Sequence, residues 1–157
     1  MEAAFEKAEG VVEAVSGYMG GRGENPTYED YARKGHVEVI QVFYDPSVIT
    51  YDKLLDVFWR QIDPTDSKGQ FVDRGPQYRS AIFYDNEDQK AQAERSRDAL
   101  QASGRFQDPI VTEILPAATF YKAEAYHQNY CRINSLHYKR YRSFSGRDRF
   151  LDDIWGK

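Results

Sequence analysis

Two acids and two tyrosines are the side chains of this sequence best suited to chemistry: Glu38, Asp73, Tyr28 and Tyr78. A carboxylic acid in apolar surroundings has a raised pKa, because burial disfavours its charged form, and it can then donate a proton near neutral pH. Tyrosines combine an apolar ring with one directional hydroxyl, so they can line a pocket with a polar end. The alternatives are a Glu38 that faces solvent or pairs with an arginine, an Asp73 that forms a turn, and tyrosines that serve packing.

Other familiar catalytic and binding motifs are absent from the sequence. The glycines of residues 20–23 lack the spacing of a phosphate-binding loop and the Lys-Ser/Thr that follows it. His36, His127 and Cys131 do not have the spacing of metal ligands. The sequence also lacks the Gly-x-Ser-x-Gly turn of many hydrolases. We therefore expect neither a metal nor another cofactor.

Cys131 is the only cysteine, so the 157 residues cannot form an internal disulfide. A single thiol is most often a small buried hydrophobic group. His127 precedes it by four residues, which is one turn if this segment is helical, and a neighbouring imidazolium lowers the pKa of a thiol. Cys131 is thus either a core residue or a thiol with redox chemistry.

Glu38 belongs to a predicted strand that covers residues 37–43. β-Branched and aromatic residues dominate this stretch, Gly35 precedes it, and Asp45 and Pro46 end it. Both faces of the strand are mostly apolar, so we expect an interior strand that is covered on both sides. A carboxylate at position 38 would then be costly, which favours a neutral acid there.

The elements that must position these residues alternate along the chain. Strands are also expected at residues 11–18, 78–84 and 110–115, helices at 1–7, 50–61, 86–103 and 124–134, a short helix after residues 25–28, and an irregular loop at 67–77. The helix after the N-cap Thr50 carries one apolar stripe: Leu54, Leu55, Phe58 and Ile62. This order predicts an α+β or α/β sandwich with helices covering a mixed sheet.

The size and composition are those of one globular domain. The chain has 157 residues, a net charge of −4 and 41% hydrophobic residues, so we expect a single domain over residues 1–157. Residues 135–157 are rich in Tyr, Arg and Phe, and we expect them to pack onto the domain as a tail. The net charge does not favour nucleic-acid binding, no apolar run is long enough to cross a membrane, and no leader is evident. A cytoplasmic location is the resulting expectation.

Several segments, taken in order, resemble class A peptide methionine sulfoxide reductase. They are GYMGG (17–21), NPTY (25–28), GHVE (35–38), YDP (44–46), DRGPQYRS (73–80) and YHQ (126–128). Together they cover essentially the whole chain up to the tail. The resemblance implies a two-layer α/β sandwich of ferredoxin-like type and the reduction of methionine S-sulfoxide, free or in proteins.

The resemblance also implies roles for the acids and tyrosines. In the family a thiolate attacks the sulfoxide sulfur, the oxygen is protonated and lost as water, and a sulfenic acid remains. Glu38 matches the acid that protonates this oxygen. Tyr28 and Tyr78 match the tyrosines that hold it, and Asp73 matches the second acid, which assists through water. His127 lies in the motif at residues 126–128 and is expected to contribute to substrate binding.

The family nucleophile has no counterpart in this chain. It belongs to a Gly-Cys-Phe-Trp-Gly/Cys motif directly before the helix that here begins at Met1, and those residues are not in the sequence. We therefore expect these 157 residues to be inactive unless they are extended upstream, where the nucleophile is a cysteine or a selenocysteine whose codon reads as a stop. The alternative is a non-catalytic module that binds methionine or methionine sulfoxide.

The expected reductant is an external thiol. Many family members have resolving cysteines in a C-terminal tail, but residues 135–157 contain none. A sulfenic acid would then be reduced by thioredoxin or another external thiol, with Cys131 as the alternative resolving thiol.

Overall fold

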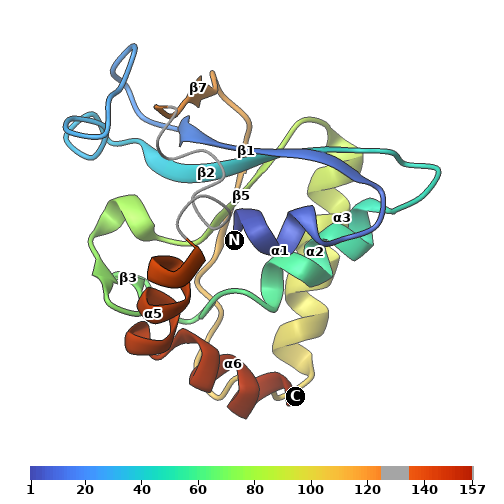
Figure 1. Ribbon diagram of the computed structural model, residues 1–157. Helices are drawn as coiled ribbons and strands as arrows, with labels where there is room; N and C mark the ends of the chain where they lie inside the picture. The colour runs from blue at the N-terminus through green and yellow to red at the C-terminus, as the bar shows by residue number, and fades with distance from the viewer. Residues whose placement is uncertain (125–134, 157) are drawn as a thin grey trace.

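The computed structural model describes residues 1–124 and 135–156. Its strands form three separate sheets (Figure 1). Strands β1 (Val11–Met19), β2 (Val37–Tyr44) and β7 (Tyr121–Lys122) form an antiparallel sheet in the order β2-β1-β7. Strands β3 (Gly69–Gln70) and β4 (Asp73–Arg74) pair antiparallel, and β5 (Ala81–Tyr84) pairs parallel with β6 (Glu113–Pro116). The predicted α+β class is confirmed, with antiparallel and parallel pairs in separate sheets.

Five helices accompany the strands in the described part of the chain. They are α1 (Glu2–Glu6), α2 (Tyr51–Trp59), α3 (Glu87–Ala102), α5 (Ser135–Ser145) and α6 (Arg147–Trp155). The predicted cap at Thr50 is confirmed, because its side chain accepts a hydrogen bond from the Lys53 N–H, and Asn86 caps α3 in the same way through the Gln89 N–H. None of the described helices is long and apolar enough to cross a membrane.

Strand β2 is an edge strand of its sheet in the described structure, so the prediction of an interior strand is wrong. Its described partner is β1, and Glu38 lies opposite Tyr18 in the ladder. Ile40 and Val42 pack with α1 and α2, whereas Phe43 on the other face is 48% exposed. The apolar pattern of a strand shows which faces tend to be buried, but it does not show whether a second strand covers its edge.

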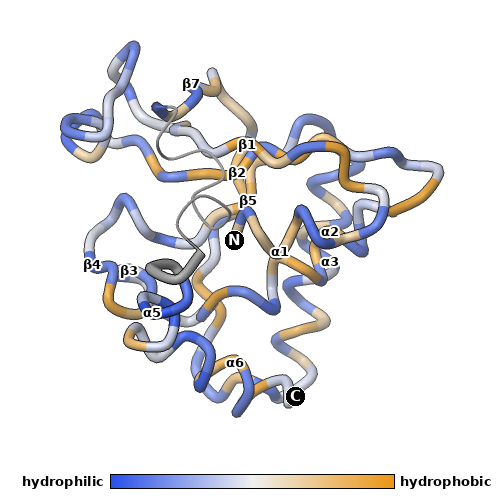
Figure 2. The backbone as a smooth tube through the Cα atoms, in the orientation of Figure 1, coloured by the Kyte–Doolittle hydropathy of each residue, from blue (hydrophilic) through white to orange (hydrophobic). Residues whose placement is uncertain are grey.

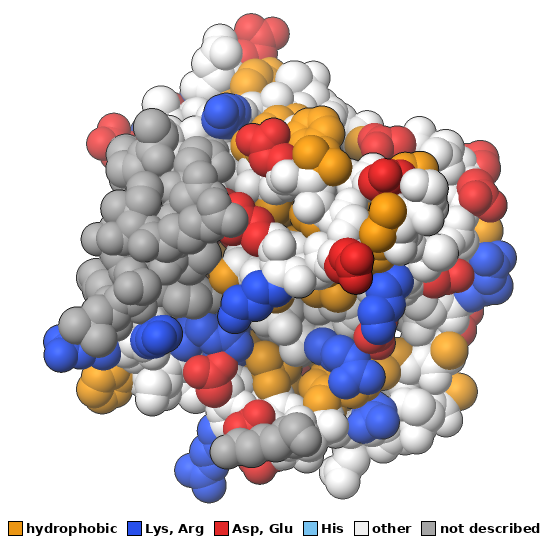
Figure 3. Space-filling model, turned by 45° about the vertical axis from the view of Figure 1, so that its right-hand side comes forward, with side chains coloured by type: hydrophobic (Ala, Val, Ile, Leu, Met, Phe, Trp, Pro, Cys, Tyr) orange, Lys and Arg blue, Asp and Glu red, His pale blue; other side chains and the backbone are white. Residues whose placement is uncertain are grey.

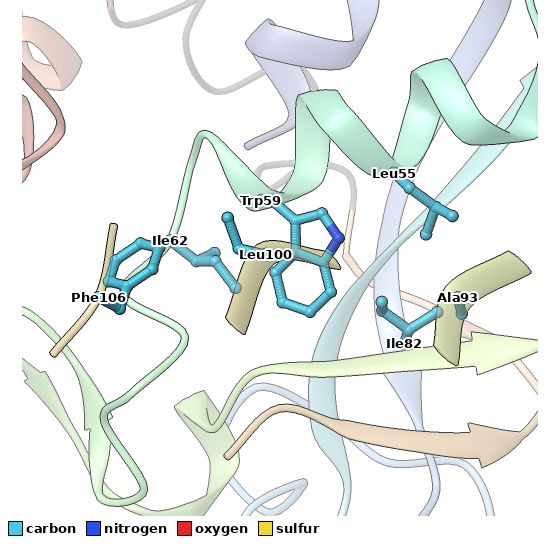
Figure 4. Packing of buried hydrophobic residues seen from close by; sticks show 7 residues of the cluster. All are labelled: Leu55, Trp59, Ile62, Ile82, Ala93, Leu100 and Phe106. Atoms are coloured by element: carbon cyan, nitrogen blue, oxygen red, sulfur yellow. The ribbon is translucent and has the colours of Figure 1, made fainter. Parts of the chain in front are cut away.

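The main hydrophobic core joins α2, α3 and β5. Figure 4 shows its buried members: Leu55, Trp59, Ile62, Ile82, Ala93, Leu100 and Phe106. Leu54, Leu55 and Ile62 of the predicted stripe are buried, and Phe58 packs against the same core. Figure 2 shows hydrophobic residues concentrated where β1, β2 and β5 lie close to α1 and α2. These contacts fix the strands that carry the candidate site.

The C-terminal helix α6 is held against this core by aromatic contacts. The ring of Trp155 lies between the guanidinium groups of Arg60 and Arg105, at 4.4 and 4.6 Å from their central carbons. Phe150 contacts the rings of Phe71 and Phe106, with centroids 5.5 and 6.4 Å away. Residues from three distant segments therefore fix the position of α6.

Several predicted element boundaries differ from the structure. The strand predicted at 78–84 begins at Ala81, after a short 3-10 helix η1 (Pro76–Tyr78). The segment after residues 25–28 consists of turns rather than a helix, and the loop predicted at 67–77 contains the β3–β4 pair. The strand predicted at 110–115 is β6, Glu113–Pro116. The helix predicted at 124–134 lies almost wholly outside the described residues.

Candidate active site

A cavity of about 480 Å³ lies among α1, α2, β2 and β5. Three of the predicted side chains line it: Glu38 from β2, Asp73 from β4 and Tyr78 from η1. Met1 and Arg147 line it as well. The structure therefore brings together residues that are up to forty positions apart in the sequence and come from three different elements.

Glu38 lines the cavity from the edge strand β2. Its surface is largely accessible, yet the surrounding protein removes enough water from the carboxyl to raise its pKa. The negative charge of Asp73 raises the pKa further. A hydrogen bond from Tyr31 and the positive charge of the Met1 amino group act in the opposite direction. The net effect is a pKa above the ordinary value for a glutamic acid.

Asp73 has a partner from the C-terminal tail. The hydroxyl of Tyr141, on α5, donates a hydrogen bond to the Asp73 carboxylate. Burial and this hydrogen bond raise the pKa of Tyr141, so its hydroxyl stays protonated and remains a donor. The sequence analysis did not identify Tyr141, because the only signal was the high aromatic content of residues 135–157.

Tyr78 is placed by a tight turn before it. Gly75 precedes η1 with a φ of 131°, a backbone conformation that residues with a Cβ rarely adopt. Burial raises the pKa of Tyr78, and a hydrogen bond with Tyr31 lowers it. The hydroxyl is thus a neutral donor and acceptor at the cavity wall.

Tyr31 is a second residue that the sequence analysis missed. Its side chain is only 3% exposed, and its ring stacks on Tyr18 with centroids 4.6 Å apart. Burial raises the pKa of the Tyr31 hydroxyl, and the charge of Glu38 raises it further. The sequence offered little reason to select Tyr31, because its only distinguishing feature is that it follows Tyr28 by three residues.

Tyr28 does not line the cavity. It is 47% exposed, and its ring centroid is 6.3 Å from that of Tyr31. Its backbone N–H donates to the carboxylate of Glu124 at 3.3 Å. Its predicted role in holding the sulfoxide oxygen stays a prediction.

His36 is a structural residue beside the site. Its Nδ1 accepts a hydrogen bond from the Gly21 N–H at 3.0 Å, so Nε2 carries the proton and donates to the Gly23 carbonyl at 2.6 Å. This neutral imidazole ties the glycine-rich loop to the start of β2. Within the described residues, no group of His, Cys, Asp and Glu could hold a metal ion. The other two singled-out residues, His127 and Cys131, lie outside the described residues.

Charge is unevenly distributed over one face of the molecule. Figure 3 shows most acidic side chains in its upper half, and Lys and Arg side chains gathered with hydrophobic ones in its lower half.

This chain is similar to known proteins in sequence. The model of the family described as peptide methionine sulfoxide reductase matches residues 1–157. The peptide methionine sulfoxide reductase MsrA of Halalkalibacterium halodurans is 56% identical over 98% of this chain and 88% of its own length. That of Bacillus subtilis is 53% identical over 97% of this chain and 87% of its own length.

Solved structures show the same relationship. The reduced form of Mxr1 from Saccharomyces cerevisiae has a TM-score of 0.78 and 33% identity, and covers 85% of this chain and 78% of its own. Methionine sulfoxide reductase A of Corynebacterium diphtheriae has a TM-score of 0.74 and 36% identity, and covers 86% of this chain and 69% of its own.

Proposed function

Because the chain belongs to the peptide methionine sulfoxide reductase family, whose members reduce methionine sulfoxide, we propose that Glu38 is the acid that protonates the sulfoxide oxygen. The observation that carries this proposal is the shared cavity of Glu38, Asp73 and Tyr78. Desolvation raises the pKa of Glu38, and the negative charge of Asp73 on the same cavity raises it further. A sulfoxide oxygen is a poor leaving group until it is protonated, so a neutral acid supplies what the reaction needs.

The proposed reaction conserves atoms and charge in two stages. A thiolate forms a bond to the sulfoxide sulfur while Glu38 gives its proton to the oxygen, which leaves as water after a second protonation. Water then attacks the thiol-derived sulfur, and the sulfur–sulfur bond breaks to give the thioether and a sulfenic acid. The sum is one sulfoxide, one thiolate and one proton going to one thioether and one sulfenic acid.

Tyr78 and Asp73 would support this proton transfer. The Tyr78 hydroxyl is a neutral donor on the cavity wall and can hold the sulfoxide oxygen. The negative charge of Asp73 raises the pKa of Glu38 and so favours retention of its proton. Methionine S-sulfoxide, free or in oxidised proteins, is the proposed substrate.

The attacking thiolate is proposed to come from a residue ahead of Met1. Cys131 is the only cysteine among the 157 residues. Met1 lines the same cavity as Glu38, and its amino group is close enough to lower the pKa of that acid. A residue joined to this amino group would therefore lie near the cavity. Two external thiols, such as those of a thioredoxin, would convert the sulfenic acid back to the thiol with release of water.

The test joins the segment Gly-Cys-Phe-Trp-Gly to Met1 and measures reduction of methyl p-tolyl sulfoxide with dithiothreitol. We expect turnover in the extended protein and none in the 157-residue chain. Glu38→Gln in the extended protein should lower the rate by about a hundredfold or more, the size of a lost general acid. Glu13→Gln is the matched control, because Glu13 is an exposed carboxylate on the adjacent strand β1.

Two results would contradict the proposal. Undiminished turnover after Glu38→Gln would remove Glu38 from proton transfer. Sulfoxide binding without turnover in the extended protein would instead support the non-catalytic binding module.

A further inference from the structure

We infer that the cavity is a slot for one further β-strand, and that it binds an extended peptide with one apolar face and a basic residue at each end. The peptide is a segment of another polypeptide chain. The inference goes beyond the proposed function, because it concerns the length of the cavity beside two strands and not the proton transfer at Glu38.

The cavity runs along the edges of β2 and β5. Consecutive residues of β2, 37–42, line it, and so do consecutive residues 78–83, which lead into β5. Successive side chains of a strand point to opposite faces, so a cavity on one face would be lined by every second residue. A lining of consecutive residues means that the cavity borders the backbone of both strands.

Both strands can accept a further partner. Within the described residues, β2 pairs with β1 alone and β5 pairs with β6 alone. Edge strands are often protected by Lys or Pro, but neither β2 (VEVIQVFY) nor β5 (AIFY) contains either, and Glu38 is their only charged residue. An extended peptide has N–H and C=O groups on both sides, so one strand can pair with both edges.

Helices cover one face of the slot. Ile40 and Val42 of β2 pack with α1 and α2. Leu54 and Phe58 of α2 line the cavity as well. On the other face of β2, Phe43 is 48% exposed. A strand between β2 and β5 therefore needs apolar side chains toward the helices and tolerates polar ones on its other face.

The lining contains more acidic than basic groups. The acids are Glu2, Glu38, Asp73 and Asp85, and the cationic groups are Arg79, Arg147 and the amino group of Met1. Both arginines have partners. Arg79 pairs with Glu113 at 2.9 Å, and Arg147 donates to the backbone carbonyl of residue 61 at 2.7 Å. Basic residues at the ends of the peptide therefore complement the charge of the slot.

The test adds the peptide acetyl-Lys-Thr-Val-Thr-Val-Thr-Val-Lys-amide to the 157-residue chain and measures binding by isothermal titration calorimetry. At about 3.3 Å per residue, the six central residues span about 20 Å, which is the length of β2 that lines the cavity. We expect a complex with one peptide per chain. The matched peptide with aspartates in place of the valines lacks the apolar face and should not bind, and equal binding of both peptides would contradict the inference.

Two N-methylated peptides show whether both edges are used. The N–H groups of alternate residues in a strand point to opposite sides, so methylating the valine nitrogens blocks pairing with one edge and methylating the threonine nitrogens blocks the other. We expect each change to weaken binding at least about tenfold, the effect of two or three lost backbone hydrogen bonds. Full binding of either methylated peptide would overturn the inference, because the peptide would then lie on a face or pair with one strand only.

Amide hydrogen exchange locates the bound peptide and tests the other occupants. Alternate amides of β2 and of β5 should gain protection when the unmodified peptide binds, and protection of neither strand would refute the slot. A stable dimer in which these amides are already protected would assign the slot to a second copy of the chain. Loss of peptide binding in the protein extended by Gly-Cys-Phe-Trp-Gly would assign it to the residues ahead of Met1. Either result would overturn the choice of another chain as the source of the strand.

Discussion

The hydroxyl of Tyr141 donates a hydrogen bond to the carboxylate of Asp73, across a sequence separation of 68 residues. This contact joins helix α5 to the cavity that Glu38 and Asp73 line. Since Asp73 raises the pKa of Glu38, the tail acts on the proposed proton donor through one side chain.

Tyr141→Phe should destabilise the protein by about 1–2 kcal/mol, because it removes a partly buried hydrogen bond to a charged group. Urea unfolding at pH 7 measures this. The double mutant with Asp73→Asn isolates the pair, and we expect a coupling energy of about 1 kcal/mol or more. Additive effects of the two single changes would show that the contact contributes nothing in solution.

Asp73→Asn should lower the pKa of Glu38, because it removes the like charge that favours the protonated acid. Carboxyl NMR titration of Glu38 gives the midpoint directly. In an active protein, the loss of rate on raising the pH should begin at lower pH in this variant. Asp98→Asn, an exposed change on α3, should leave the midpoint where it is. A Glu38 midpoint that rises after Asp73→Asn would contradict the geometry.

Glu38→Gln should stabilise the protein above the folded-state pKa of Glu38 and have little effect at low pH. The folded protein holds the Glu38 proton more tightly than the unfolded chain, so this group's contribution is full below the ordinary pKa of 4.5 and is lost as the pH rises through the folded value. Glutamine stays neutral and avoids that loss.

The free energy of unfolding in urea at pH 4 and pH 8 measures the effect of Glu38→Gln. Glu13→Gln, on the adjacent strand, should match the unmodified chain at both values. Equal stability of Glu38→Gln and the unmodified chain at pH 8 would mean that the fold does not disfavour the Glu38 charge.

Gly17→Ala should destabilise the fold by about 1–3 kcal/mol through overpacking. A Cβ at this position would lie 2.3 Å from two ring atoms of Phe120 and 2.6 Å from the Tyr121 carbonyl oxygen. Backbone atoms cannot move aside as readily as the end of a flexible side chain. The added Cβ would therefore force β7 away from β1. Val12→Ala, a change at a 75% exposed residue of β1, is the control and should cost far less in thermal or urea unfolding.

Local sequence predicted most elements of the fold because their determinants are local. The caps at Thr50 and Asn86 need only a side-chain oxygen and the backbone three residues later. The apolar stripe of α2 follows from helical periodicity alone. Sequence motifs likewise singled out Glu38, Asp73 and Tyr78, which the fold brings to one cavity.

Local sequence did not reveal the neighbours of these residues. The role of Tyr141 depends on a hydrogen bond to a residue on another element, and this tyrosine does not differ in its own segment from one that only packs. The edge position of β2 was also missed, because strand pairing joins distant segments. The sequence by itself determined which residues could be acids and donors. The tertiary structure decided that the pKa of Glu38 is raised, because a pKa depends on burial and on charges brought close by folding.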